Sequence, residues 1–120
     1  MRVGLSLTMV AVCGAMHGVA VAQDTVRFDR PIFTTEATVL CARQQDITAL
    51  GRARDDNDRT AVERIVNRNC KQVAPDIRLT VVAKPGLYDP DVEVRVASAP
   101  DLDPSLPRGK MWTLKSMLRN

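Results

Sequence analysis

The sequence predicts a single small α+β domain, in which two helices precede a β-hairpin and a last strand. Residues 60–69 carry apolar side chains at helical spacing, at positions 61, 62, 65 and 66. Residues 77–84 and 92–97 alternate between apolar and polar side chains instead, which is typical of strands with one buried face. A chain of 120 residues has the length of one domain.

Residues 1–22 have the features of a secretory signal peptide. Arg2 is followed by an uncharged apolar run, residues 3–16, which is shorter than the roughly 20 residues that a membrane span needs. A retained membrane anchor is the alternative, and this length argues against it. The run ends before Ala-Val-Ala, a small-x-small site, so we expect cleavage between Ala22 and Gln23. The mature chain is therefore expected to be periplasmic or secreted, with no transmembrane helix.

Cys13 offers a second alternative, a lipid anchor. A lipobox normally places Gly, Ala or Ser before its cysteine, whereas Val12 precedes Cys13, so we do not favour this anchor. Cleavage of the signal also removes His17, the one histidine. The mature chain then keeps two cysteines, Cys41 and Cys70.

Exported proteins meet oxidising conditions, so Cys41 and Cys70 are expected to form a disulfide. Catalytic pairs usually lie close together, as in Cys-x-x-Cys, whereas these two are far apart in the sequence. We therefore interpret the pair as structural. A small domain buries a limited part of its surface, and a disulfide compensates for this.

The first half of the mature chain is predicted to hold one strand and both helices. Residues 23–35 form a polar leader, expected to be extended on the domain or partly disordered. Residues 37–41 are apolar and partly β-branched, which favours a strand. Residues 43–53 and 60–69 are the two predicted helices, within a helical insert that spans 42–69.

Local signals mark the helix ends. Gly51 is a predicted stop or fraying point of the first helix. Thr60 and Glu63 have the spacing of a capping box at the start of the second. Residues 55–58 read Asp-Asp-Asn-Asp and could bind calcium, but the EF-hand pattern would need a glycine where Ala61 stands. We therefore interpret them as a turn between helices.

The second half is predicted to be β-structure. Pro85 and Gly86 lie in the short link that joins the two alternating runs into an antiparallel hairpin. Residues 99–109 contain three prolines and are predicted to be a loop. Residues 111–114 form a last short strand, and 116–118 form a single turn or a closing strand.

The chain end reads Lys-Met-Trp-Thr-Leu-Lys-Ser-Met-Leu over residues 110–118. Together with Val-Leu-Cys at 39–41, the cysteine after the second helix and the hairpin, it resembles small exported bacterial SH3-like domains. Such domains often have glycine where Met111 stands. The resemblance covers residues 36–118. It implies an SH3-like β-barrel over 36–120, with a two-helix insert after the first strand.

The residue inventory argues against an enzyme. Without histidine, and with both cysteines paired, the mature chain lacks a zinc site and a Ser/His/Asp or Cys/His system, and we expect no metal or cofactor. The spacing of the carboxylates singles out no glycosidase pair. The 17 basic and 14 acidic residues are well mixed, which argues against nucleic acid as a partner.

Tyr88 and Trp112 are the candidate binding residues, because SH3-like domains often bind peptides through an aromatic-lined groove. The alternatives are a core role for Trp112 and an ordinary loop position for Tyr88. The resulting hypothesis is a non-enzymatic binding module of the bacterial cell envelope, whose partner is an envelope protein or cell-wall component. The alternative is a small periplasmic inhibitor or immunity protein that blocks a hydrolase through the 99–109 loop.

Overall fold

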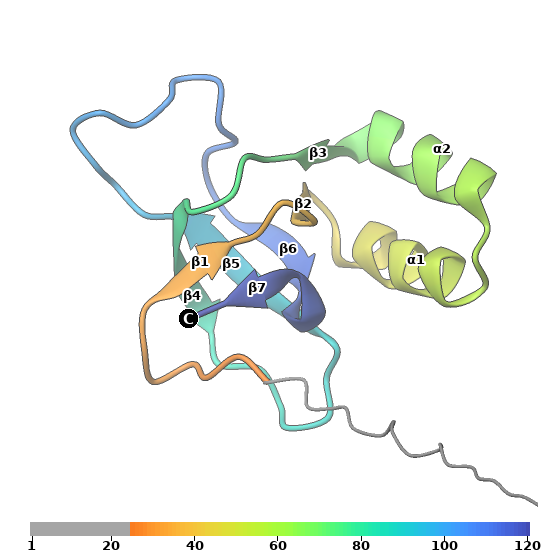
Figure 1. Ribbon diagram of the computed structural model, residues 1–120, viewed down its shortest axis with the longest axis horizontal. Coiled ribbons are helices and arrows are strands. Elements are labelled where there is room, and N and C mark those ends of the chain that lie inside the picture. The colour runs from red at the N-terminus through yellow and green to blue at the C-terminus, as the bar shows by residue number, and fades with distance from the viewer. Residues whose placement is uncertain (1–24) are drawn as a thin grey trace, which may run out of the picture.

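The computed structural model describes residues 25–120, and these form an α+β fold, as the sequence predicted (Figure 1). Two helices project from one side of a seven-stranded antiparallel sheet. The elements are, in order, β1 Ile32–Thr34, β2 Val39–Cys41, α1 Gln44–Asp55, α2 Arg59–Asn69, β3 Cys70–Gln72, β4 Arg78–Ala83, β5 Asp91–Val96, β6 Met111–Leu114, the 3-10 turn η2 Lys115–Met117 and β7 Leu118–Arg119. The proposed cleavage site and Cys13 lie outside the described residues.

The strand order is β3-β2-β6-β5-β4-β1-β7. The sheet is not closed, because β3 and β7 are its outer strands and do not pair with each other. The predicted closed barrel is therefore replaced by a curved open sheet within residues 25–120. The α+β class holds, and the finer SH3-like assignment stays a proposal.

The helices follow the second strand and not the first. Ile32–Thr34, expected only to be extended, forms β1 because it pairs with both β4 and β7. Ile32 lies opposite Leu79, and Thr34 lies opposite Leu118. Residues 70–72, for which no strand was predicted, form the edge strand β3, which pairs with β2. Both strands are only three residues long, so their sequence patterns are weak.

Helix α1 continues past Gly51 to Asp55, beyond the predicted stop. A glycine here lowers helix propensity but does not break the hydrogen-bond ladder. A β-carbon at Gly51 would contact the side chain of Leu114 at 3.6 Å, so the helix crosses the sheet closely at this point. Ile47 and Leu50, three residues apart on one face of the helix, are both fully buried.

Helix α2 begins one residue before the predicted Thr60, and its cap is different. The N-cap is Asp58, whose side chain accepts a hydrogen bond from the Ala61 backbone N–H at 3.1 Å. The predicted capping box of Thr60 and Glu63 is therefore wrong: Thr60 is already inside the helix. The apolar stripe of α2 is half-buried, and none of its residues is fully buried.

We expect Asp58→Ala to lower the free energy of unfolding by about 1 kcal/mol, because the Ala61 N–H loses its acceptor. Thr60→Ala should have an effect within about 0.5 kcal/mol, since Thr60 is exposed and does not cap the helix. Urea denaturation of both variants makes the comparison. A larger loss of stability for Thr60→Ala than for Asp58→Ala would instead support the predicted capping box.

The predicted hairpin is confirmed, with β4 and β5 antiparallel. Leu79 pairs with Val96, and Val81 pairs with Val94, but the register shifts between Val81 and Ala83. This bulge interrupts the period-two pattern. Ala83, predicted to face inward with Val81, is therefore exposed.

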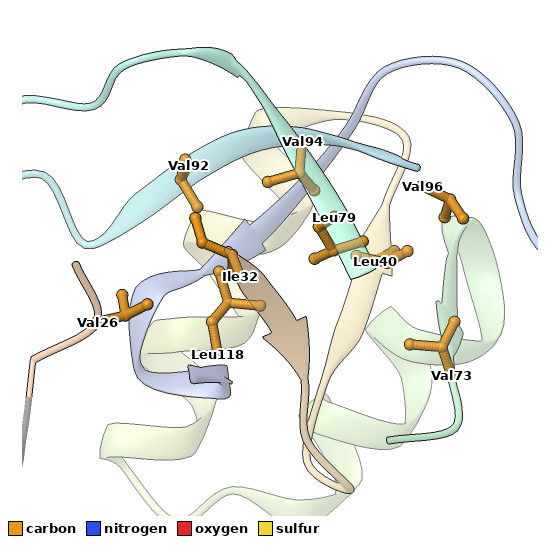
Figure 2. Packing of buried hydrophobic residues seen from close by; sticks show 9 residues of the cluster. All are labelled: Val26, Ile32, Leu40, Val73, Leu79, Val92, Val94, Val96 and Leu118. Atoms are coloured by element: carbon orange, nitrogen blue, oxygen red, sulfur yellow. The ribbon is translucent and has the colours of Figure 1, made fainter. Parts of the chain in front are cut away.

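Two hydrophobic clusters stabilise the fold. The first lies within the curve of the sheet and includes Leu40, Val94 and the leader residue Val26 (Figure 2). The second lies between the sheet and the helices and includes Cys41, Ile47, Leu50, Leu114 and Met117. Leu40 and Cys41 are neighbours in β2 and point to opposite faces, so this strand joins the two clusters.

Met117 links the start of β2 to the end of the sheet through hydrogen bonds that involve side chains, in place of strand pairing. The Thr35 and Thr38 hydroxyls both donate to its carbonyl oxygen, at 2.7 and 2.6 Å. The backbone N–H of Val39 donates to its sulfur at 3.4 Å, and so does the Thr113 hydroxyl at 3.7 Å. The Met117 side chain is 1% exposed, so these bonds form inside the protein.

Candidate functional site

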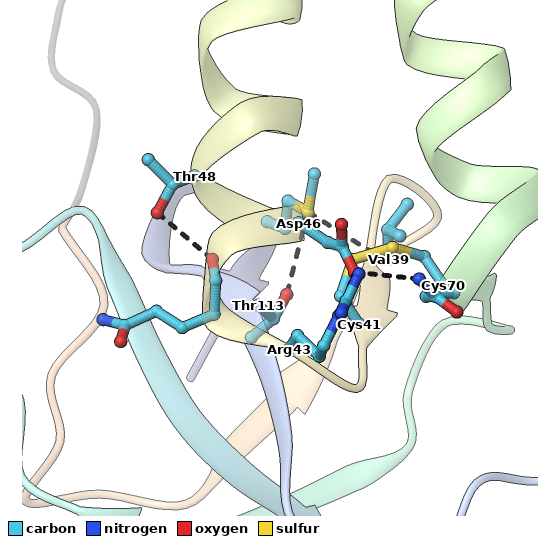
Figure 3. Close-up of a disulfide and its surroundings, with 10 residues drawn as sticks. Val39, Cys41, Arg43, Asp46, Thr48, Cys70 and Thr113 are labelled. Carbon is cyan, nitrogen blue, oxygen red and sulfur yellow. Dashed lines mark hydrogen bonds and ion pairs between the residues drawn. A yellow bond between two sulfur atoms is a disulfide. The ribbon is translucent and has the colours of Figure 1, made fainter.

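The disulfide lies where the helices join the sheet, as Figure 3 shows. Cys41 and Cys70 are directly opposite each other on β2 and β3, with their Cα atoms 4.0 Å apart. Cys41 is fully buried. The bond therefore fixes both ends of the helical segment to one place, as predicted for a structural disulfide.

A buried carboxylate supports the same junction. Asp46, in the first turn of α1, accepts hydrogen bonds from the Arg43 Nε and the Asn69 side-chain amide, both at 3.3 Å. Asn69 is the last residue of α2 and precedes Cys70. Asp46 therefore ties the start of one helix to the end of the other, and its role is structural.

Trp112 belongs to this junction. It lies in β6 opposite Cys41 on one side and Glu93 on the other, and packs half-buried against the second cluster. The core alternative considered for Trp112 thus matches its surroundings more closely than an open aromatic groove.

Tyr88 lies in a different environment, in the loop that joins β4 to β5, residues 84–90. Leu87 is 83% exposed and Tyr88 is 92% exposed, and these are the large hydrophobic side chains that residues 25–120 leave exposed. Tyr88 is thus exposed in a loop, whereas Trp112 is half-buried in β6. Two adjacent apolar side chains at a loop tip form a compact contact surface.

The loop at 84–90 is held in one conformation by hydrogen bonds. The Asp89 carboxylate accepts from the Gly86 N–H at 3.0 Å, and the Asp89 N–H donates to the Gly86 oxygen at 3.2 Å. Lys115 anchors the loop to η2: its Nζ donates to the Gly86 oxygen at 2.7 Å, and its N–H donates to the Pro90 oxygen at 2.8 Å. A β-carbon at Gly86 would lie 2.7 Å from an Asp89 oxygen, so a side chain at this position would displace the carboxylate that closes the turn.

An open hollow of about 540 Å³ lies beside this loop. Its walls come from four parts of the chain: the leader at Val26, α1 at Gly51 and Arg54, the end of the loop at Pro90, and the segment around Lys115. Pro90 and Lys115 also hold the base of the loop, so the hollow and the loop are continuous. Neither Tyr88 nor Trp112 lines this hollow.

The 99–109 loop follows the opposite end of strand β5 from the 84–90 loop, and projects away from the sheet there (Figure 1). Lys71 of the edge strand β3 holds it by donating to the Ser105 oxygen at 2.8 Å. Asp103 accepts hydrogen bonds from the Ser105 N–H and hydroxyl, both at 2.9 Å. These bonds favour the charged carboxylate and lower the pKa of Asp103 below its usual 3.8.

Titration of Asp103 should therefore open this turn only in acid. A lowered pKa means that the Ser105 bonds stabilise the folded loop at neutral pH, and that this contribution is lost as the pH falls below 3.8. We expect the Ser105 amide proton resonance to titrate with a midpoint under 3.8. Ser105→Ala should move the midpoint upward, since one of the two bonds is removed. A midpoint that Ser105→Ala leaves unchanged would contradict the assignment.

In residues 25–120, no group of three His, Cys, Asp or Glu side chains could hold a metal ion. Within the 55–58 turn, Asp58 caps α2, as described above. No helix in this range is long and apolar enough to span a membrane.

Sequence analysis found Tyr88 but missed what surrounds it. Leu87 precedes Tyr88 between Gly86 and Asp89, and an apolar pair at the tip of a tight turn is the signal that could have identified the surface. The hollow had no comparable signal, because its walls come from four separate segments of the chain.

Comparisons with models of protein families, with curated proteins and with solved structures find no match to this chain.

Proposed function

We propose that the mature chain is a non-enzymatic binding module of the bacterial cell envelope, exported to the periplasm or beyond, with an SH3-like core. The observation that carries this proposal is the fixed loop at 84–90, which presents Leu87 and Tyr88 to solvent. An exposed apolar pair is unfavourable in water, and tyrosine is among the residues that contribute most to protein interfaces. A hydrogen-bonded loop loses little conformational freedom on binding.

The signal-like leader and the disulfide support export, because disulfides persist in oxidising compartments. The absence of histidine from the mature chain supports a binding role over acid–base catalysis. The partner expected from this surface is an envelope protein or a cell-wall component.

A photo-crosslinking residue placed at position 88 tests the proposal in cells. We expect defined products with an envelope protein, or with cell-wall material, from this position. The matched control places the same residue at Arg64, an exposed position on α2. Equal crosslinking from both positions, or none from position 88, would contradict a binding role for the loop.

The second candidate is a periplasmic inhibitor or immunity protein that acts through the 99–109 loop. The observation in its favour is the projection of this loop, together with its anchor at Lys71 (Figure 1). Deleting residues 101–106 should then abolish inhibition of a hydrolase while the hairpin of β4 and β5 stays folded. Unchanged partner binding after this deletion would count against it.

A further inference from the structure

The loop at 84–90 and the neighbouring hollow form one continuous surface. Pro90 and Lys115 line the hollow and also fix the base of the loop. One face of the molecule therefore carries both a projection, Leu87 and Tyr88, and a recess. A two-fold axis between projection and recess would place each projection over the recess of the other copy.

The recess has the chemistry that the loop tip requires. Its apolar walls include Val26, Leu114 and Leu118, and its volume of about 540 Å³ lies within the range that binding pockets span. The hydroxyl of Ser116 and the carboxylate of Asp55 line the same recess. They provide hydrogen-bonding groups for a tyrosine hydroxyl whose ring enters the apolar part.

One pair of charged side chains on the two parts is complementary. Asp89 lies in the loop next to Tyr88, and Arg54 lies on the α1 wall of the hollow. Both residues are exposed. In a two-fold arrangement the Asp89 of one copy approaches the Arg54 of the other, twice per dimer, which favours this register over one that pairs like charges.

We infer that the occupant of the hollow is the Leu87–Tyr88 tip of a second copy of this chain, so that the module forms a reciprocal homodimer. The inference rests on the proposed function, in that it uses the same loop as a protein-binding element, and it names the partner. The dimer buries the exposed apolar pair of both copies in one interface. It leaves the 99–109 loop and the edge strand β3 outside that interface.

Sedimentation velocity of the exported chain over a range of concentrations tests the inference. We expect a monomer–dimer equilibrium, and Tyr88→Ala should raise the dissociation constant by about 10-fold or more. Arg54→Glu should weaken the dimer as well, because it then faces Asp89. Arg64→Ala, on the exposed face of α2, is the matched control and should leave the dissociation constant unchanged.

Mixing two defective variants provides the sharper test. Tyr88→Ala removes the projection and keeps the hollow, whereas Ser116→Trp fills the hollow from an exposed position and keeps the projection. A reciprocal dimer predicts that the mixture associates more tightly than either variant alone, because one projection again meets one open hollow. No gain on mixing would overturn reciprocity.

A wild-type chain that stays monomeric at a concentration of about 1 mM would overturn the inference. Crosslinking from position 88 then decides the proposed function separately. Products with another envelope component would keep the binding module while excluding the homodimer. Products with neither another component nor a second copy would contradict both.

Discussion

Replacing Cys41 and Cys70 together with alanine should lower the free energy of unfolding by about 3–4 kcal/mol. The disulfide joins residues 29 apart in the sequence. In a chain-entropy treatment, closing a loop of this length removes conformational entropy from the unfolded state and so raises the free energy of that state by this amount. The loss is a large part of the roughly 5–15 kcal/mol typical of a domain. Urea denaturation of the double variant, and of the reduced wild type, measures it.

The loss should be uneven along the chain. Helix α2 has no fully buried residue, so its attachment depends on α1, on β3 and on the disulfide. Strands β4 and β5 pair along most of their length and contribute Leu79, Val92 and Val94 to the other cluster. Hydrogen exchange should therefore show residues 42–69 losing protection before 77–98. Simultaneous loss in both segments would contradict this division.

The parts of the fold that the sequence predicted are those with a local pattern. The helical spacing before Cys70 and the alternation around Val94 both result from one buried face, and each is visible within one segment. Strands β1 and β3 are too short for such a pattern. Their pairing depends on residues far away, such as Leu79 for Ile32 and Val39 for Gln72. The open sheet follows from these pairings and so could not be predicted.

The same distinction separates the two candidate binding residues. Tyr88 lies between Gly86 and Asp89 in a short turn, so its exposure could be expected from its place in the turn. The surroundings of Trp112 are set by contacts from β2, the helices and the disulfide, and no neighbouring residue encodes them. The hollow beside Pro90 depends on tertiary structure in the same way. Local chemistry therefore identified the projection, and only the fold showed the recess.

Met117 is the second position where a large loss of stability is expected. Met117→Ala should lower the free energy of unfolding by about 2–5 kcal/mol, because it opens a cavity in the second cluster. It also removes the sulfur that accepts from the Val39 N–H. Two causes are therefore combined in this variant, and a second variant is needed to separate them.

Met117→Leu keeps the volume and removes only the acceptor. The buried N–H of Val39 and hydroxyl of Thr113 then lose this partner, at a cost of about 1–3 kcal/mol. Met111→Leu in β6 is the matched control, because this methionine packs half-buried against the first cluster and its sulfur accepts no hydrogen bond from residues 25–120. If the two leucine variants have equal stability, the sulfur does not act as an acceptor. If Met117→Leu has a clearly lower free energy of unfolding than Met111→Leu, hydrogen bonds to the Met117 sulfur stabilise the fold. These side-chain bonds then join β2 to the end of the open sheet, where a closed barrel would have backbone hydrogen bonds.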